Sequence, residues 1–329
     1  MRRVLVLLSL AFATALLNPV NLVAGESVQR VMRIAFVSQS SASAYQSYFS
    51  AFREQLKKLG YVEGQNLAIE ARWADGHLDR LPGLTAEVVE HKIDVIVTGA
   101  TPGAVAAKNA TSTIPIVGVA MGDPVRSGLA ASLARPGGNL TGLSMGYSEG
   151  IAGKWLELLQ EMVPRFSTIA VITNPANSWE QDRVKELDAI AAKRHLKVKI
   201  IELRDAQVLG SALKQARRQA QAALALANAI TMTHPRQITS LAAEYRIPVM
   251  YTVRGFVDEG GLIAYASDMK VQYRKAADYV DRILKGTNPG DLPIEQPTQF
   301  ELVVNLKTAK TLGVTIPESI LLRADEVIR

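Results

Sequence analysis

Short apolar segments alternate with helical patterns along most of the chain. The first such segment, Arg33 to Val37, is rich in apolar residues and short enough for a strand. In the helical pattern that follows, large apolar residues recur at spacings of three and four from Tyr45 to Leu59. They mark one face of a helix that ends at Gly60. Alternation of this kind is typical of a parallel sheet covered by helices on both faces, so the sequence predicts an α/β fold.

The alternation forms two series of similar size. In the first series, further strands are expected at 66–70, 94–98, 116–119 and 140–144, and helices at 81–91 and 102–109. Glycine- and proline-rich segments at 122–124 and 135–139 interrupt the pattern. The second series has expected helices at 148–162, 178–194, 207–221 and 234–246, and strands at 168–173, 197–203, 222–227 and 248–252. Because 329 residues exceed what one core usually supports, we expect two doubly wound, Rossmann-like lobes.

Three connections between these lobes are expected. The first follows the strand at 140–144, and the strand Leu262 to Ala266 is expected to return the chain to the first lobe, because the helix after it has an apolar face. A proline-rich passage from Pro289 to Pro297 then leads to a strand at 301–304. The predicted boundaries are 32–143 plus 266–299 for the first lobe and 144–265 plus 300–329 for the second. Multiple crossings of this kind form a hinge beside a cleft that closes around a ligand.

Residues 1–25 have the layout of a signal peptide. Arg2 and Arg3 precede an apolar run from Val4 to Leu17, and cleavage is expected near Ala24 or Gly25. The competing interpretation is an uncleaved membrane anchor, but the apolar run is shorter than the roughly 20 residues needed to cross a bilayer. We therefore expect an exported, periplasmic protein.

Composition narrows the partners. Cysteine is absent, which excludes disulfides, thiolate nucleophiles and lipid attachment through a cysteine. Without Arg2 and Arg3 the net charge is only about +4, and the basic segments lie on expected helices, where a solvated surface explains them. No nucleic-acid partner is expected, and a monomer is the default for a protein of this kind.

Candidate ligand-binding residues lie after the strands, because open α/β sheets bind ligands beyond the carboxyl ends of their strands. Hydroxyl, amide and backbone N–H groups there suit an anionic group such as a carboxylate. The candidates at or near strand ends are Ser38, Ser40, Thr98, Gly99, Thr101, Asp123, Ser144, Asn174, Tyr251, Arg254 and Asp268.

Several of these candidates have a structural alternative. Thr101 before Pro102 is a favoured helix cap, and Asn174 before Pro175 is a favoured turn. Asp123 and Asp268 are candidate partners for a ligand ammonium, but each also suits a turn or a cap. Tyr45, Tyr147 and Tyr251 are candidates for stacking on a flat ligand, although Tyr45 also fits the apolar stripe of its helix.

Motifs for catalysis and for metal binding are missing. The four histidines, His77, His91, His195 and His234, show no paired ligand spacing, so no metal site is expected. Neither a nucleophile elbow nor a phosphate-binding loop is present. We therefore expect neither an enzyme nor a cofactor.

Several longer motifs resemble one family. They are LGYVEGQN at 59–66, IPIV at 114–117, DPV at 123–125, SLARPGGNLTG at 132–142, GGL at 260–262, LPIEQP at 292–297, NLKTAKTLG at 305–313 and the pair Ile316–Pro317. On these motifs the chain resembles the ABC transporter substrate-binding proteins of the tryptophan- and tyrosine-uptake type. The resemblance implies a type I periplasmic-binding-protein fold with three interlobe crossings, no enzymatic activity, and a permease and an ATPase as partners. It does not fix the solute, and the segment 226–232 departs from the family pattern at a strand end.

The leading hypothesis is capture of an amino acid, possibly aromatic, or of another small carboxylate, by lobes that close around it. An alternative is a periplasmic sensor that presents its bound state to a membrane receptor or kinase. An exported enzyme has only the fold in its favour, and fold does not determine function. A DNA-binding regulator of the LacI type would need a helix pair where the leader is expected.

Overall fold

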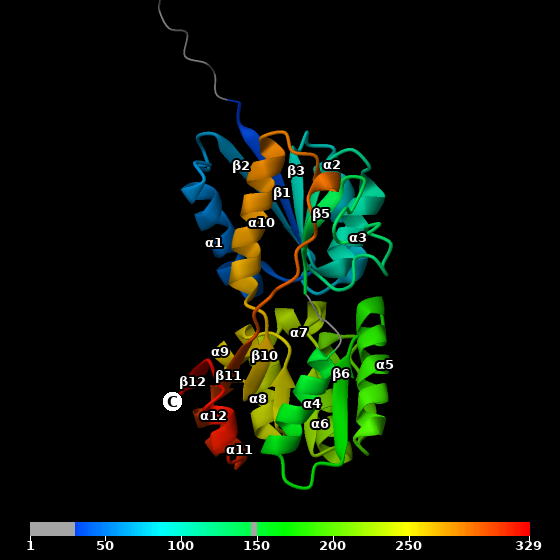
Figure 1. The fold of residues 1–329 in the computed structure, drawn as a ribbon, viewed down its shortest axis with the longest axis vertical. Helices are drawn as coiled ribbons and strands as arrows, with labels where there is room; N and C mark the ends of the chain where they lie inside the picture. The colour runs from blue at the N-terminus through cyan, green and yellow to red at the C-terminus, as the bar shows by residue number, and fades with distance from the viewer. Residues whose placement is uncertain (1–29, 146–149) are drawn as a thin grey trace, which may run out of the picture. The chain divides into compact units, whose positions relative to one another are not determined.

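A computed structural model describes residues 30–145 and 150–329. The expected leader and Tyr147 lie outside these residues. Within Val31–Arg329 the chain forms two sheets, each covered by helices, as Figure 1 shows. No helix in these ranges is long and apolar enough to cross a membrane.

The first lobe is built on a five-stranded parallel sheet with strand order β2-β1-β3-β4-β5. Its strands are β1 (Met32–Ser38), β2 (Leu67–Trp73), β3 (Val95–Gly99), β4 (Ile116–Met121) and β5 (Leu140–Ser144). The central strands are buried along their whole length, which explains their nearly continuous apolar runs.

Helices cover both faces of this sheet. They are α1 (Ala42–Lys58), α2 (Leu81–Val89), α3 (Ala100–Ala110) and α10 (Met269–Leu284), with short 3-10 turns at Leu78–Arg80 and Pro289–Asp291. Figure 1 shows α1 beside α10 on one face of this sheet. Between them and the sheet, the ring of Phe36 contacts the rings of Phe52 and Tyr273. Val88 of α2 and Ala104 of α3 share an apolar cluster with Val37, whose side chain points to the other face.

The second lobe has a seven-stranded sheet with the order β12-β11-β10-β9-β8-β6-β7. Its strands are β6 (Thr168–Thr173), β7 (Lys197–Glu202), β8 (Ala222–Ala225), β9 (Val249–Tyr251), β10 (Ile263–Ala266), β11 (Glu301–Asn305) and β12 (Glu326–Ile328). All pairs are parallel except β10 with β11.

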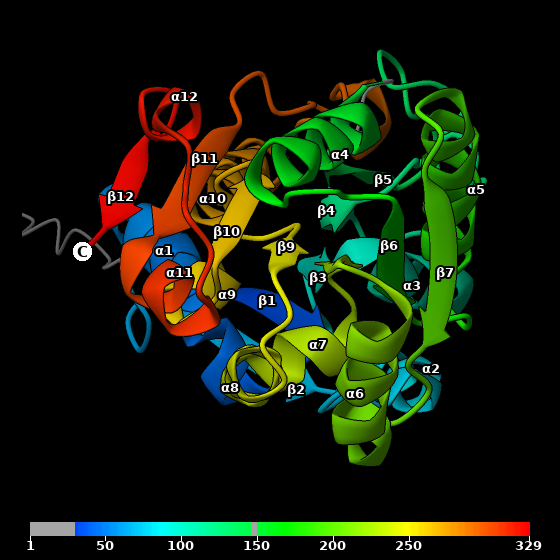
Figure 2. The ribbon, with the colours of Figure 1, turned by 90° about the horizontal axis from the view of Figure 1, so that it is seen from below.

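The helices of this lobe are α4 (Ile151–Met162), α5 (Ser178–Lys193), α6 (Leu209–Gln219), α7 (Ala229–Thr233), α8 (Pro235–Glu244), α9 (Gly255–Asp258), α11 (Leu306–Leu312) and α12 (Glu318–Leu321), with a 3-10 turn at Ala206–Val208. Figure 2 shows α4 and α6 on opposite sides of the sheet. Two apolar clusters agree with this: one holds Leu156 of α4, the other Leu213 of α6.

One connection differs from the prediction. The strand Leu262 to Ala266 was expected to return the chain to the first lobe, but β10 pairs with β9 and β11 in the second sheet. The prediction failed because only the helix after the strand carries the first-lobe pattern. The return comes after Ala266, where α10 begins at Met269. The fold class is confirmed: two doubly wound lobes joined by three chain crossings.

The last crossing lies along the end of the first sheet. Ser144 N donates to Glu295 O at 2.9 Å, and Glu295 N donates to Gly142 O at 3.0 Å. The segment after α10 therefore pairs with β5 on its way to β11.

Candidate functional site

The two lobes enclose a small cavity between the carboxyl ends of their strands. We name it the inner cavity. The residues that line it are Gln39, Tyr45, Ala100, Thr101, Ala120, Gly122, Met145, Asn177, Trp179, Ala227, Met232, Val253 and Met269. They lie at the ends of β1, β3, β4 and β5 in the first sheet, or directly after these strands, and after β6, β8, β9 and β10 of the second sheet. The volume of about 40 Å³ holds little more than one water molecule, so a larger ligand requires the lobes or the side chains to move.

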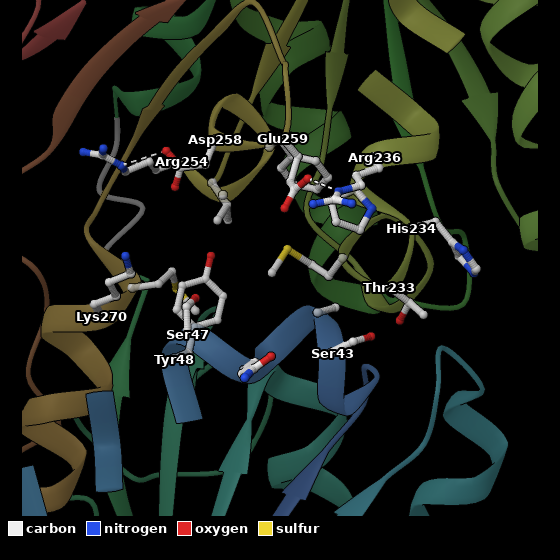
Figure 3. Close-up of a pocket in the computed structure, with 18 of the residues that line it drawn as sticks. Ser43, Ser47, Tyr48, Thr233, His234, Arg236, Arg254, Asp258, Glu259 and Lys270 are labelled. Atoms are coloured by element: carbon white, nitrogen blue, oxygen red, sulfur yellow. Dashed lines mark hydrogen bonds and ion pairs between the residues drawn. The ribbon is translucent and has the colours of Figure 1, made fainter. Parts of the chain in front are cut away.

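A wider groove of about 1120 Å³ adjoins the inner cavity (Figure 3). The start of α1 forms one wall with Ser43 and Ser47, and α7 to α9 form the opposite wall with Thr233, His234 and Arg236. The groove and the inner cavity share only the lining residues Met232, Val253 and Met269. The groove is larger, but the strand ends of both lobes meet at the inner cavity, which is where open α/β sheets bind ligands.

Two alanines of the inner cavity have left-handed backbone. Ala100 has φ of 60° and Ala120 has φ of 54°, a region in which L residues other than asparagine and aspartate are uncommon. Each such residue costs about 1–3 kcal/mol and persists where the surroundings impose it, which is common at binding sites. At Ala100 this conformation lets the chain turn from β3 directly into α3, and at Ala120 it accompanies an irregularity near the end of β4, where the pairing with β5 shifts register.

Thr101 joins the start of α3 to the loop after β4 instead of capping its helix. The helix α3 begins at Ala100 with Gly99 as its cap residue, so the prediction that Thr101 caps the helix is wrong. The Thr101 Oγ1 atom accepts a hydrogen bond of 2.9 Å from the Gly122 N–H. The turn at Ala100 shifts the helix start two residues earlier than the Thr-Pro pair indicates.

The lobes touch directly at Gly122. A Cβ atom there would lie 2.0 Å from Cδ1 of Trp179, so only glycine fits. Trp179 is in the first turn of α5, and the Arg183 guanidinium lies over its ring at 5.6 Å. Beside this contact, Arg126 of the first lobe forms an ion pair of 2.5 Å with Asp182.

A second interlobe contact involves Ser40. Its Oγ atom lies 2.8 Å from Thr233 Oγ1 in α7. The two contacts lie on either side of the inner cavity, because Ser40 follows β1 and Gly122 follows β4. The lobes are therefore in contact around the cavity.

The buried carboxyl group of Glu180 connects the loops that line the inner cavity from the second lobe. The Oε2 atom of Glu180 accepts hydrogen bonds from Thr173 Oγ1 at 2.9 Å, from Asn174 N at 2.8 Å and from Asn228 Nδ2 at 3.3 Å. Its Oε1 atom accepts one from Asn177 Nδ2 at 2.9 Å. Burial raises the pKa of Glu180 from 4.5 to about 8, although these hydrogen bonds oppose the rise. Glu180 therefore ties the loop after β6 to the loop after β8 beneath Asn177.

Gln39 contributes a buried polar atom that lacks a partner. The residue is 3% exposed and lines the inner cavity, and its Oε1 atom has no hydrogen-bond partner among the described residues. Buried amide oxygens are normally hydrogen-bonded, and an unpaired one is costly. Gln39 is therefore an acceptor available to a bound molecule.

Neither Gln39 nor Glu180 is among the site residues predicted from the sequence. Gln39 follows a strand, as the named candidates do, and could have been included on that ground. Glu180 follows β6 by seven residues on a charged helix, so nothing in its local pattern shows that it is buried.

Of the predicted site residues, Tyr45 and Thr101 line the inner cavity. Tyr45 also belongs to the core, since its ring meets those of Tyr48 and Tyr273 edge-on at 5.4 and 6.0 Å. Burial raises the pKa of Tyr45 to about 12. The Tyr45 phenol is therefore neutral at physiological pH.

The other predicted hydroxyl residues are buried close to the site without lining it. Ser38 Oγ accepts from Ser40 N at 3.1 Å, and Thr98 lies under Gly103 of α3. Gly99 is the cap residue of α3, and Ser144 ends β5. These residues shape the strand ends that carry the lining residues.

The predicted Asn and Asp residues have the structural roles that were considered for them. Asn174 Oδ1 accepts from Ala176 N at 2.9 Å within a turn. Asp123 Oδ1 accepts from Val125 N and Arg126 N at 3.1 and 2.9 Å. Asp268 caps α10 and lines the groove.

Tyr251 and Arg254 lie away from the inner cavity. Tyr251 is 1% exposed and stacks on Phe256 with ring centroids 4.9 Å apart. Arg254 lines the groove and forms ion pairs with Glu326 at 2.6 Å and Glu301 at 3.1 Å. Partial burial opposes it, but these ion pairs raise the pKa of Arg254 above its ordinary value.

Within the described ranges, no three His, Asp or Glu side chains are grouped closely enough to hold a metal ion. The lining of the inner cavity offers hydrogen bonds and apolar surface. This arrangement suits binding of an organic molecule.

Comparisons with known proteins agree with this architecture. The sequence profile described as "ABC transporter substrate binding protein" matches residues 31–328. A tyrosine-binding protein of Clostridioides difficile (strain R20291) is 28% identical over 261 residues, which are 79% of this chain and 75% of that protein.

Two crystal structures are similar over 91% of this chain and all of theirs. One is a conserved domain protein from Vibrio cholerae, with 30% identity and a TM-score of 0.85. The other is the ABC domain in complex with L-Trp from Streptococcus pneumonia, with 24% identity and a TM-score of 0.82.

Proposed function

Because the chain belongs to the ABC transporter substrate-binding protein family, we propose that its inner cavity captures an amino acid between the two lobes for delivery to an importer. The observation that carries the choice of site is the meeting of strand ends from both lobes around a buried, unpartnered Gln39. The relative from C. difficile is a tyrosine-binding protein, and the similar S. pneumonia structure holds L-Trp. An amino acid, possibly aromatic, is therefore the first ligand class to test.

Closure of the lobes provides the mechanism, and no chemical step is needed. A ligand that contacts residues of both lobes favours the closed arrangement by its differential affinity for that state. Met145, Met232 and Met269 line the cavity with flexible side chains that adapt to a bound apolar group. Tyr45 and Trp179 offer aromatic surface on opposite lobes.

The partners follow from the family. We propose a permease and an ATPase in the inner membrane as partners, and the periplasm as the location after removal of the leader. A monomer suits a protein that carries solute to a membrane complex.

A thermal-shift screen tests this function. The protein without its leader is refolded once to remove carried-over ligand and is then heated with individual amino acids, sugars and organic acids. A ligand at 100 times its Kd stabilises the folded state by roughly 2.7 kcal/mol, which raises the Tm by several degrees. Stabilisation by an amino acid is expected, and a response to sugars alone contradicts the proposal.

Two variants locate the site. Trp179→Leu is expected to weaken binding of the active amino acid at least about tenfold, because it removes aromatic surface from the inner cavity. Gln46→Leu is the matched control, since Gln46 is exposed and lines only the groove. If Gln46→Leu weakened binding and Trp179→Leu did not, the ligand would bind in the groove and not in the inner cavity.

A further inference from the structure

Three side chains separate the inner cavity from the groove. Among the described residues, only Met232 of α7, Val253 after β9 and Met269 at the start of α10 line both spaces. We name these three residues the shared wall. Their exposed fractions are 7%, 2% and 5%, so they are packed between the two spaces. Beyond the shared wall, the groove lies between Ser47 and Thr233 (Figure 3).

Much of the remaining lining is held in place. The ring of Trp179 rests against Gly122, at a position where a Cβ atom would clash. Thr101 Oγ1 accepts the hydrogen bond from Gly122 N, and Asn177 Nδ2 donates one of 2.9 Å to Glu180 Oε1. Moving these groups would break buried hydrogen bonds, which is costly. While the lobes are in contact, space for a ligand must therefore come from another part of the lining.

The shared wall is the part that can move and thereby open the larger space. Methionine is unbranched and has three rotatable bonds, so Met232 and Met269 can turn aside, whereas Val253 is β-branched and stiff. Met145 is equally flexible, but it lines the inner cavity alone, so its displacement gives no access to the groove.

Displacement of Met232 and Met269 would join the cavity of about 40 Å³ to the groove of about 1120 Å³. Ligand pockets commonly measure about 300–1,000 Å³, so the joined space is large enough for a whole amino acid and the inner cavity alone is not.

The path through the shared wall is apolar. Phe256 lines the groove and belongs to the same cluster of apolar side chains as Met232, Val253 and Met269. An unpaired charge among such groups is costly, so a ligand side chain that enters this path should be mainly apolar.

From these observations we infer that the side chain of the bound amino acid passes between Met232 and Met269 toward the groove, and that these two methionines limit the side-chain length that the protein accepts. The inference rests on the proposed function and deepens it. The ligand class that it names is amino acids with an extended, mainly apolar side chain.

Calorimetric titration with amino acids of increasing side-chain length tests this inference. The series is L-alanine, L-leucine, L-phenylalanine and L-4-phenylphenylalanine, which carries a second phenyl ring at the end of the first. The double variant Met232→Ala with Met269→Ala joins the inner cavity to the groove. It is expected to raise the affinity for L-4-phenylphenylalanine, relative to the amino acid identified by the thermal-shift screen, by at least about tenfold.

Met145→Ala is the matched comparison. It removes the same side-chain atoms from the inner cavity without opening the shared wall, so the same affinity ratio is expected to rise by less than about threefold. The Tm of each variant without ligand reports whether it folds. If the double variant does not fold, the single variants Met232→Ala and Met269→Ala are titrated instead, with the ratio expected to rise in the same direction.

The outcomes distinguish the two proposals. If no amino acid binds the native protein, the proposed function fails. If amino acids bind but the variants of Met232 and Met269 leave the ratio unchanged, or if Met145→Ala raises it as much as they do, the role of the shared wall is overturned and the proposed function stands.

Discussion

At Gly122 the first lobe presents bare backbone to the Trp179 ring of the second. We predict that Gly122→Ala weakens ligand binding about tenfold or more, because the added methyl group would lie 2.0 Å from Trp179 and overpacking costs about 1–3 kcal/mol. The strain can be relieved by parting the lobes, so the Tm without ligand should change little.

The matched control for this prediction is Gly83→Ala. Gly83 is in α2, and an added Cβ would meet nothing within 4 Å. Titration of both variants with the same ligand checks the prediction. Equal affinities would show that the Gly122 contact does not belong to the ligand-bound arrangement.

Glu180 makes stability depend on pH. Its pKa is raised to about 8 in the folded chain, so the folded state binds a proton that the unfolded chain releases above about pH 4.5. The stabilisation from this proton is fully present below pH 4.5 and is lost as the pH rises to 8, with a slope of at most about 1.4 kcal/mol per pH unit.

Urea unfolding of the native protein and Glu180→Gln at pH 5, 6.5 and 8 tests this dependence. The free energy of unfolding of the variant, relative to the native protein, is expected to rise with pH, because the variant lacks the titrating group. Other titrating groups are common to both proteins and cancel in the difference. Parallel pH profiles would contradict the shifted pKa.

Among the elements, Arg254 ties the edge of the second sheet together. It bridges the end of β9 to β11 through Glu301 and to β12 through Glu326. We predict that Arg254→Ala lowers the free energy of unfolding by about 1–2 kcal/mol but leaves ligand affinity within about twofold. Arg254 is among the ligand contacts predicted from the sequence, so a large loss of affinity without loss of stability would favour that prediction.

Arg236→Ala is the control for Arg254. Arg236 also lines the groove and pairs with Glu259, but its side chain is 85% exposed. Its removal should leave the free energy of unfolding nearly unchanged.

The elements were largely predictable because their signals are local. The strand at 168–173 and the helix stripe of α1 follow from spacing alone, and both agree with the structure. The short helix α7 is not predicted from the sequence, because its five residues are too few to show an apolar periodicity. A capping box formed by Asn228 and Thr231 stabilises it instead. The partner of β10 depends on which sheet has a free edge, and the strand's own residues do not encode this.

The site was less predictable than the fold. The ends of the strands lead to the part of the molecule where the inner cavity lies, and two of the candidates, Tyr45 and Thr101, line that cavity. Asp123, Asn174 and Asp268 are turn or cap residues instead, because the same polar side chains serve both purposes. Trp179 and Glu180 lie on a helix whose contacts with Gly122 and Asn228 join distant parts of the chain, so only the folded arrangement shows their roles.

In the whole molecule, the proposed function requires two lobes that hold a ligand between them. The lobes meet on either side of the inner cavity, at Ser40 with Thr233 and at Gly122 with Trp179. Ligand exchange therefore requires these contacts to open. Because the chain has no cysteine, a cross-link can be introduced at one of them without competing thiols.

The most direct test joins the lobes by a disulfide bond between Ser40→Cys and Thr233→Cys. In the native chain the hydroxyl oxygens of Ser40 and Thr233 lie 2.8 Å apart. Ligand release is measured with radiolabelled amino acid, and the two single variants serve as controls. Protein oxidised after loading is expected to retain the ligand until a reductant is added, and protein oxidised before loading is expected not to bind it. Free exchange of ligand in the cross-linked protein would contradict binding between the lobes.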